Sequence, residues 1–102
     1  MSDFTVGNTP KNKDEEELKD PNDCTVVILN DNYTPGAVVV RILCEIFHKN
    51  EENAISIMQE AHDNGQAIVG KYAYDIAQTM VRTAASIVKE MGYPLGFELR
   101  EG

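Results

Sequence analysis

Residues 26–36 have the sequence VVILNDNYTPG, an apolar run that stops abruptly at three small polar side chains. The β-branched and aliphatic residues over 24–29 predict a buried strand, and the Asn-Asp-Asn triplet predicts the turn that ends it. Thr34 is expected to cap the free amides of a following helix, with Pro35 at the first helical position. Local signals on both sides therefore hold three amide or carboxylate groups at a strand-to-helix junction.

The triplet Asn30-Asp31-Asn32 allows two interpretations. One is an ordinary turn, because Asn and Asp favour turns through short hydrogen bonds from their side chains. The other is a polar recognition cluster held on a rigid frame. This stretch alone leaves both interpretations open.

Two helices are predicted after this junction. Apolar residues recur at helical spacing over 35–48, which predicts an amphipathic helix there. Asn50, followed by two acidic residues, indicates the start of a second helix. Asn64-Gly65 is typical of the left-handed ending of such a helix.

The last third of the chain predicts a strand, a helix and a strand. A strand is expected over 66–72, where Gly70 marks a bulge or a close approach of backbone. A helix is expected over 74–90, with an apolar stripe that runs from Ile76 to Met91. Pro94 then breaks the chain before a short strand over 95–99.

The predicted order is β-α-α-β-α-β, which indicates an α+β fold. We expect a small sandwich with a three-stranded antiparallel sheet and three helices on one face, because this arrangement buries the apolar stripes. The core domain is expected to span 24–102. Residues 1–23 are expected to form a disordered N-terminal arm, because their seven acidic residues, three lysines and few apolar side chains cannot form a core.

Charge and cysteine content limit the partners and the compartment. The 102-residue chain has a net charge of −8, which argues against nucleic acid and anionic membranes as partners. No stretch has the length of a membrane span or the pattern of a signal peptide. Cys24 and Cys44 have no metal-binding spacing and are interpreted as reduced core thiols. We expect a cytoplasmic protein, and a monomer.

The sequence lacks the usual signatures of enzymes. It has no glycine-rich phosphate loop, no paired Cys/His spacing and no nucleophile elbow, so no catalytic residue, metal or cofactor is expected. His48 is expected to lie at the C-terminal end of the first helix, where an imidazolium favours the helix dipole. His62 continues the apolar face of the second helix, so a packed helix residue and an acid–base or binding residue both remain open.

Several short motifs, in this order, resemble the ClpS family of N-end-rule adaptors of Clp AAA+ proteases. They are Asn30-Asp31-Asn32-Tyr33-Thr34-Pro35, Met58, Ala61-His62, Gly65, Gly70 and Pro94-Leu95. The resemblance extends over essentially all of 25–101, and an acidic N-terminal arm is also typical of the family.

The resemblance implies a non-enzymatic adaptor. Such adaptors bind a free protein N-terminus whose first residue is Leu, Phe, Tyr or Trp and deliver it to a Clp AAA+ unfoldase. By position, Asn30, Asp31 and His62 match the residues that hold the α-ammonium group, directly or through water. The matching pocket residues are Ile28, Leu29, Asn32, Thr34, Pro35, Gly36, Val39, Met58, Ala61 and Leu95. Strand alternation should let only one of Ile28 and Leu29 face the pocket.

Two pocket positions differ from the family pattern. Gly36 stands where relatives usually carry a methionine that disfavours β-branched first residues, and Ala61 stands in place of the usual valine. We expect N-terminal Ile and Val to gain relative to Leu, because a steric wall is missing. The alternative, which the sequence leaves open, is that the gap weakens all ligands alike.

Two further departures concern charge and docking. Asn32 replaces the usual aspartate, which should lower the attraction for an ammonium modestly. The resemblance places unfoldase docking at Asp75, Thr79 and Met80, where Met80 replaces the family's lysine. The partner would be the N-terminal domain of a ClpA- or ClpC-like unfoldase.

Two alternative functions compete with the adaptor. One is a domain that docks on a Clp chaperone and modulates it without recognising N-termini. The other is an acid–base enzyme around Asp31 and His62, which lacks a nucleophile, metal or cofactor motif. A binding titration with free and acetylated N-termini separates all three.

Overall fold

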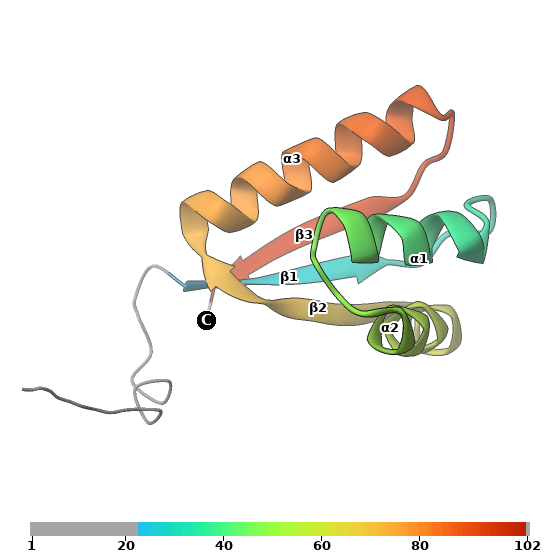
Figure 1. The fold of residues 1–102 in the computed structure, drawn as a ribbon, viewed down its shortest axis with the longest axis horizontal. Coiled ribbons are helices and arrows are strands. Elements are labelled where there is room, and N and C mark those ends of the chain that lie inside the picture. Colours follow the sequence, from blue (N-terminus) through green and yellow to red (C-terminus); the bar gives the residue numbers. More distant parts are fainter. Residues whose placement is uncertain (1–22, 102) are drawn as a thin grey trace, which may run out of the picture.

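The computed structural model of the chain describes residues 23–101, which form six elements in the expected order (Figure 1). They are β1 (Asp23–Leu29), α1 (Gly36–Glu45), α2 (Glu51–Asn64), β2 (Gln66–Ala73), α3 (Tyr74–Glu90) and β3 (Gly96–Glu101). Asp23, which the sequence placed in the N-terminal arm, begins β1. The rest of the expected arm lies outside the described residues.

The three strands form one antiparallel sheet in the order β2-β1-β3. β1 takes the centre because its side chains are apolar on both faces, and Val26, Val27 and Ile28 are all buried. Each flanking strand pairs with β1 over nearly its whole length. The predicted α+β fold with a three-stranded antiparallel sheet is confirmed.

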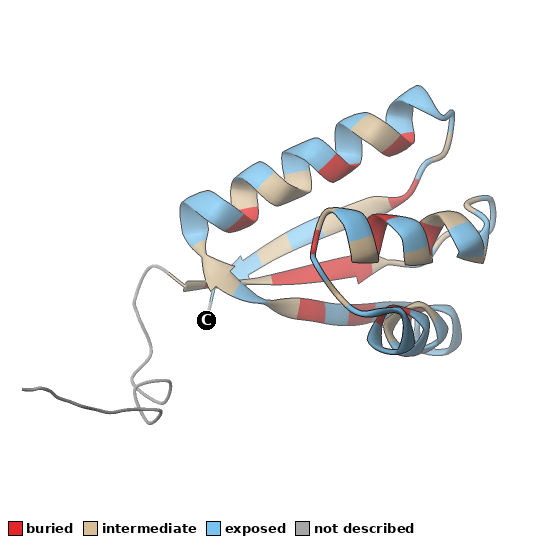
Figure 2. Ribbon diagram, in the orientation of Figure 1, coloured by how far each residue is buried: buried red, intermediate tan, exposed pale blue. Residues whose placement is uncertain are grey.

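All three helices pack on one face of this sheet (Figure 2). On β1, Cys24, Val26 and Ile28 point to that face and share a core with side chains from every helix. The buried helix residues of this core are Val39, Ile42, Leu43, Ala54, Ala61, Ala77, Ala84 and Val88. On β2, Ile68 pairs with Val27 and points to the opposite face, where it is 62% exposed.

The start of α1 differs from the prediction. Pro35 is the N-cap residue in extended conformation, and no side chain caps the helix. Thr34 lies one position before the N-cap and does not cap the helix; its hydroxyl donates to the carboxylate of Asp31 at 2.8 Å. A hydrogen bond to an ionised carboxylate is strong, so this contact directs the Thr34 side chain back toward the loop.

α1 also ends earlier than predicted, at Glu45 rather than His48. His48 adopts a left-handed backbone with φ of 60°, and the next amide, from Lys49, donates to the carbonyl of Leu43. The imidazole of His48 is exposed, and the left-handed backbone at this residue, rather than its side chain, turns the chain away from the helix. Phe47 stays buried in the core beyond the last turn.

The ends of α2 agree with the prediction. The side chain of Asn50 accepts a hydrogen bond from the amide of Asn53 at 2.8 Å, as an N-cap should. Gly65 ends the helix at φ of 90°, and its amide donates to the carbonyl of Ala61. A left-handed residue at this point favours glycine.

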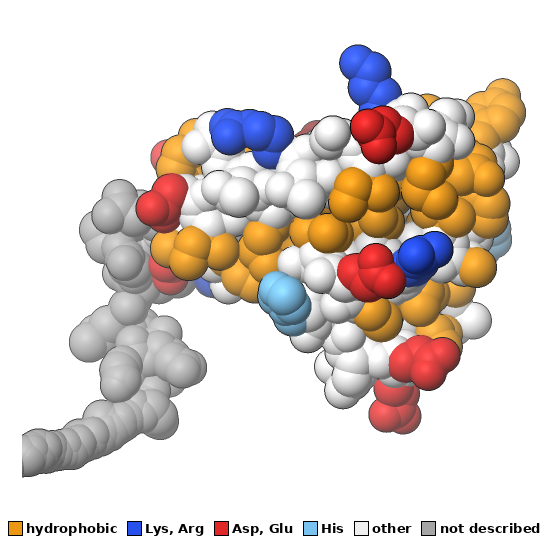
Figure 3. Space-filling model, turned by 45° about the horizontal axis from the view of Figure 1, so that its top comes forward, with side chains coloured by type: hydrophobic (Ala, Val, Ile, Leu, Met, Phe, Trp, Pro, Cys, Tyr) orange, Lys and Arg blue, Asp and Glu red, His pale blue; other side chains and the backbone are white. Residues whose placement is uncertain are grey.

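The predicted stripe of α3 is too wide at both ends. Ile76 and Met91 are 53% and 44% exposed, whereas Ala77, Ala84 and Val88 are the buried residues of the helix. Met91 belongs to a shallow cleft between α1 and α3, where Figure 3 shows hydrophobic side chains at the surface. Cys44 is half-buried rather than a core residue, whereas Cys24 is buried, and both are free thiols.

The expected irregularity at Gly70 is present. The register of β2 shifts against β1 between Val26 and Val27, which is a β-bulge. Gly70 faces the helical side, and a Cβ there would lie 2.9 Å from the hydroxyl oxygen of Tyr72. The bulge and the close approach both occur, and the aromatic ring of Tyr72 packs toward Phe47.

Gly70→Ala is expected to lower the free energy of unfolding by about 1–2 kcal/mol, because the new methyl group collides with the Tyr72 ring. Urea unfolding measures this change. Ile68→Ala, on the exposed face of the same strand, is the control and should change stability by less than about 0.5 kcal/mol. An unchanged midpoint for Gly70→Ala would show that the ring moves aside freely.

Candidate functional site

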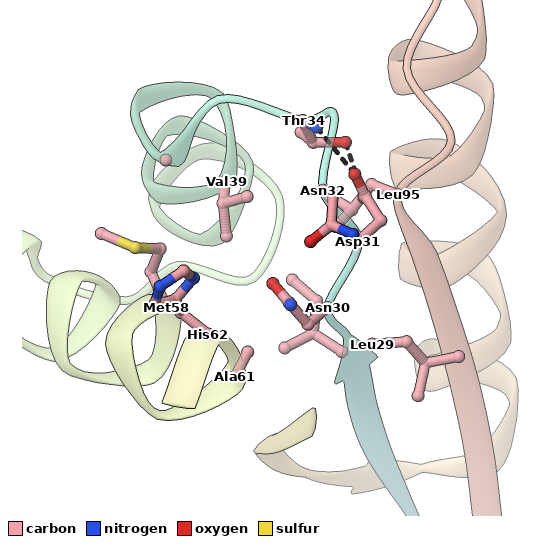
Figure 4. Close-up of a pocket in the computed structure, with 12 residues that line it drawn as sticks. Leu29, Asn30, Asp31, Asn32, Thr34, Val39, Met58, Ala61, His62 and Leu95 are labelled. Carbon is pink, nitrogen blue, oxygen red and sulfur yellow. Dashed lines mark hydrogen bonds between the residues drawn. The ribbon is translucent and has the colours of Figure 1, made fainter. Parts of the chain in front are cut away.

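A cavity of about 280 Å³ opens where β1 ends, between the loop that follows it and the helices α1 and α2 (Figure 4). Polar side chains come from the loop and from α2, and apolar side chains form the remaining walls. The residues that line it are Ile28, Leu29, Asn30, Asp31, Asn32, Thr34, Gly36, Val39, Met58, Ala61, His62 and Leu95.

The cavity brings together nearly all the ligand-binding residues that the sequence suggested. Among these residues Pro35 is the exception: it lies exposed on the loop and does not line the cavity. Leu29 points away from the other lining side chains, toward β3, where a Cβ at Gly96 would lie 3.4 Å from its Cδ1 (Figure 4). Ile28, fully buried, is therefore the strand residue whose side chain points to this side of the sheet.

The sheet positions the polar rim of the cavity. The amide of Asn30 donates to the carbonyl of Gly65 at 2.9 Å, which extends the pairing of β1 with β2 by one more bond. Gly65 directly follows α2, whose last turn carries His62. The side chains of Asn30 and His62 therefore face the same opening, as Figure 4 shows. Both side chains are exposed to solvent.

Asp31 is the most heavily bonded side chain of the rim. Its Oδ1 accepts hydrogen bonds from the amides of Tyr33 and Thr34 at 2.7 Å each, and its Oδ2 accepts from the Thr34 hydroxyl. Desolvation by burial raises the pKa of Asp31, but the bonds from Thr34 and Tyr33 together outweigh it. The pKa of this carboxyl is therefore held below its ordinary value of 3.8.

Thr34→Val is expected to raise the pKa of Asp31, because one of the bonds that favour the carboxylate is lost. A lowered folded-state pKa stabilises the loop above the ordinary value of 3.8, and this stabilisation is lost as the pH falls through the folded value. An NMR titration of the Asp31 carboxyl carbon in both proteins measures the difference. Identical titration curves would mean that the hydroxyl contributes nothing.

The inner walls of the cavity are apolar. Val39, Ala61 and Leu95 are buried, and Leu95 precedes β3 instead of belonging to it. Met58 lies across Gly36: a Cβ on this glycine would be 3.3 Å from both the sulfur and the terminal methyl of Met58. A flexible thioether thus occupies the space beside Gly36 that a larger residue would take.

This arrangement can accept hydrogen bonds from a cationic head group while it buries an apolar chain. The rim offers an amide oxygen, a carboxylate and an imidazole, which are acceptors. α2 adds a negative field, because it carries Glu51, Glu52, Glu60 and Asp63 and no lysine or arginine. Within residues 23–101, no group of three or more His, Cys, Asp or Glu side chains could hold a metal ion.

The suggested docking residues lie far from this cavity. Asp75 and Thr79 are exposed in the first turns of α3, at the opposite end of the molecule from the loop (Figure 1). The hydroxyl of Thr79 donates to the backbone carbonyl of Asp75 at 3.0 Å. Met80 is half-buried and packs against the core.

No helix in the described part of the chain is long and apolar enough to cross a membrane.

The contact between Asp31 and Thr34 was missed from the sequence. An Asp followed three residues later by a Thr is typical of local side-chain hydrogen bonding, and this spacing was the available signal. The proline at position 35 instead favours Thr34 as a helix cap, which is what the sequence alone predicts.

The fold and this cavity define a ClpS-like α+β domain, a strand-loop-helix frame around an apolar pocket with a polar rim. A family model described as "ATP-dependent Clp protease adaptor protein ClpS" matches residues 19–98. The chain belongs to the ClpS family, as the sequence predicted.

Individual relatives agree with this assignment. The chain is 37% identical over 98 residues to the ATP-dependent Clp protease adapter protein ClpS of Leptospira biflexa, covering 96% of this chain and 87% of the relative. It is 41% identical over 81 residues to the ClpS of Myxococcus xanthus, covering 79% and 76%. The solved structure of Agrobacterium tumefaciens ClpS2 bound to L-phenylalaninamide superposes with a TM-score of 0.78 at 35% identity, covering 81% of this chain and all of that one.

Proposed function

We propose that this protein is an adaptor that binds free protein N-termini with a large hydrophobic first residue and delivers them to a Clp AAA+ unfoldase. The observation that carries the proposal is the position of Asn30, Asp31 and His62 at the rim of an apolar cavity. The side chains of Asn30 and His62 face one opening, Asp31 lies beside them in the loop, and apolar walls lie behind.

The rim suits an α-ammonium group. An ammonium has three donors and no acceptor, so it needs acceptors and gains from a negative charge. Asn30 and His62 offer an amide oxygen and an imidazole nitrogen, and Asp31 offers the charge. The ClpS2 neighbour was solved with L-phenylalaninamide, a compound that has a free α-amine and a large apolar side chain.

The apolar part of the cavity suits the first side chain. Its walls include the buried hydrophobic residues Ile28, Val39, Ala61 and Leu95. Because these side chains are apolar, a ligand that covers them leaves none of their atoms without a hydrogen-bond partner. Leu, Phe, Tyr and Trp gain most from such a cavity, because they bury the most apolar area. Ile and Val are also expected to bind, because Gly36 adds no side chain to the wall.

A panel of peptides that differ only in their first residue, across all twenty amino acids, tests the proposal. Leu, Phe, Tyr and Trp peptides should bind most tightly in a fluorescence titration, and none should be turned over. Asp63→Asn, an exposed change one residue from His62, serves as the control and should keep the same ranking. Equal affinity for all twenty peptides would overturn the proposal, and turnover of any peptide would favour the acid–base enzyme instead.

The bound N-terminus must also reach the unfoldase. We assign docking to the exposed start of α3, at Asp75 and Thr79, and the partner to the N-terminal domain of a ClpA- or ClpC-like unfoldase. The half-buried Met80 contributes less surface to this contact. Asp75→Ala should leave peptide binding intact while it slows the degradation of a Leu-starting reporter by a Clp protease. Equal degradation rates with the wild type and with Asp75→Ala would contradict docking at this site.

Affinity should decline at alkaline pH. A free peptide α-amine titrates near pH 8, and binding to the rim acceptors should raise this value in the complex. Full affinity is therefore present below about pH 8 and is lost above roughly pH 9, as the bound ammonium loses its proton. Titrating a Leu-starting peptide from pH 7 to 10.5 measures the decline, and a flat profile would contradict ammonium recognition.

A further inference from the structure

Asp31 points in a different direction from its two neighbours. Figure 4 shows the side chains of Asn30 and Asn32 directed into the space between the loop and α2, whereas the carboxylate of Asp31 turns back to Thr34. The residue with the full negative charge is therefore directed toward the loop itself, and the two neutral amides face the opening.

The carboxylate of Asp31 is largely used within its own loop. An ionised carboxylate has about four acceptor positions, and the loop fills three of them. Hydrogen bonds to a charged acceptor are roughly twice as strong as neutral ones, and these three are short, at 2.7 to 2.8 Å. Little capacity remains for a direct bond to a ligand.

These bonds are what holds the loop between its two fixed ends. At one end the amide of Asn30 pairs with Gly65, and at the other the carbonyl of Pro35 accepts the first bonds of α1. Between these points, Tyr33 and Thr34 make hydrogen bonds to Asp31 alone within the described part of the chain. Without them, the direction of the neighbouring side chains would be free to vary.

We propose that Asp31 is a positioning residue, which fixes the loop so that Asn30 meets His62 across the opening. The ammonium of the ligand then makes its direct contacts with Asn30 and His62. This inference rests on the proposed function, and it changes the role of Asp31 from a ligand-contacting group to the group that orders the site.

Two substitutions at Asp31 separate position from charge. Asp31→Asn removes the charge but keeps an oxygen that can accept both amides, and its new amide group can donate to the Thr34 hydroxyl. Asp31→Ala removes the charge and all three bonds. Asp63→Asn removes one exposed carboxylate beside His62 and serves as the matched control for charge.

Amide exchange in the ligand-free proteins tests the loop directly. Asp31→Ala should speed exchange at Tyr33 and Thr34 by about 10-fold or more, whereas Asp31→Asn should stay within about 3-fold of wild type. Affinity for a Leu-starting peptide should follow the same order. It should fall by about 30-fold or more in Asp31→Ala and by about 5-fold or less in Asp31→Asn and Asp63→Asn.

Two results would overturn the inference. Equal losses of affinity in Asp31→Asn and Asp31→Ala would assign a direct ion pair to Asp31, and unchanged exchange in Asp31→Ala would show that the loop does not depend on it. A wild-type protein that binds none of the twenty peptides would overturn the proposed function. In that case the exchange rates would still decide whether Asp31 orders the loop.

Discussion

Acetylation of the N-terminus is expected to weaken the binding of a Leu-starting peptide by about 100-fold or more. The acetyl group removes the positive charge and two of the three donors, and it adds bulk at the rim. Asn30 and His62 then lose their donor in a partly enclosed site, and the negative field of α2 no longer favours the ligand. Paired titrations of free and acetylated peptides measure the difference.

The two histidines of the chain provide a matched control for this effect. His62→Ala should reduce the gap between free and acetylated peptides, because one acceptor for the ammonium is gone. His48→Asn removes the other imidazole, which is exposed at the end of α1, and asparagine tolerates the left-handed backbone there. This variant should keep the full gap. Equal affinity of both peptides for the wild type would contradict recognition of the ammonium.

The fold was predictable from sequence because its main signals are local and agree with one another. The apolar run before Asn30, the Asn50 cap and the Gly65 ending each use a well-known preference, and each predicts its element correctly. Gly70 marked a bulge for the same reason: a glycine inside a strand needs an explanation. The order of the strands, with β1 at the centre, was not predicted.

The details that escaped prediction depend on competition between neighbours. The hydroxyl of Thr34 could accept from the amides of α1 or donate to the carboxylate of Asp31, and only the folded loop shows that it donates to Asp31 and does not cap the helix. The end of α1 depends on His48 in a left-handed conformation, which histidine adopts seldom. The contact of Met58 with the space beside Gly36 joins two helices, so no sequence period could reveal it.

The wild-type protein is expected to prefer Leu-starting peptides over Ile- and Val-starting peptides by less than about 100-fold in affinity. Gly36 leaves one wall of the cavity to the flexible side chain of Met58. Met58 is half-buried, and its thioether can shift to admit a branched side chain. Gly36 lies in the first turn of α1 with ordinary helical backbone, so other residues fit there without backbone strain.

Gly36→Met should raise that preference by about 10-fold or more, because excluding one branched methyl group costs on the order of 1–3 kcal/mol. The new Cβ would start 3.3 Å from Met58, so Met58 must move and the opening narrows. Ala37→Met adds the same side chain at the next, exposed position of α1 and should leave the preference unchanged. Titrating Leu, Ile and Val peptides against all three proteins measures these changes.

The pattern of losses decides what Gly36 does. If Gly36→Met weakens Ile and Val but leaves Leu within about 3-fold, the missing side chain sets the selectivity of the cavity. If it strengthens all three peptides alike, Gly36 is a gap that costs affinity without regard to branching. A wild-type preference for Leu already above about 100-fold would mean that Met58 fills the space beside Gly36 as a rigid wall. Selectivity would then belong to α2 rather than to the start of α1.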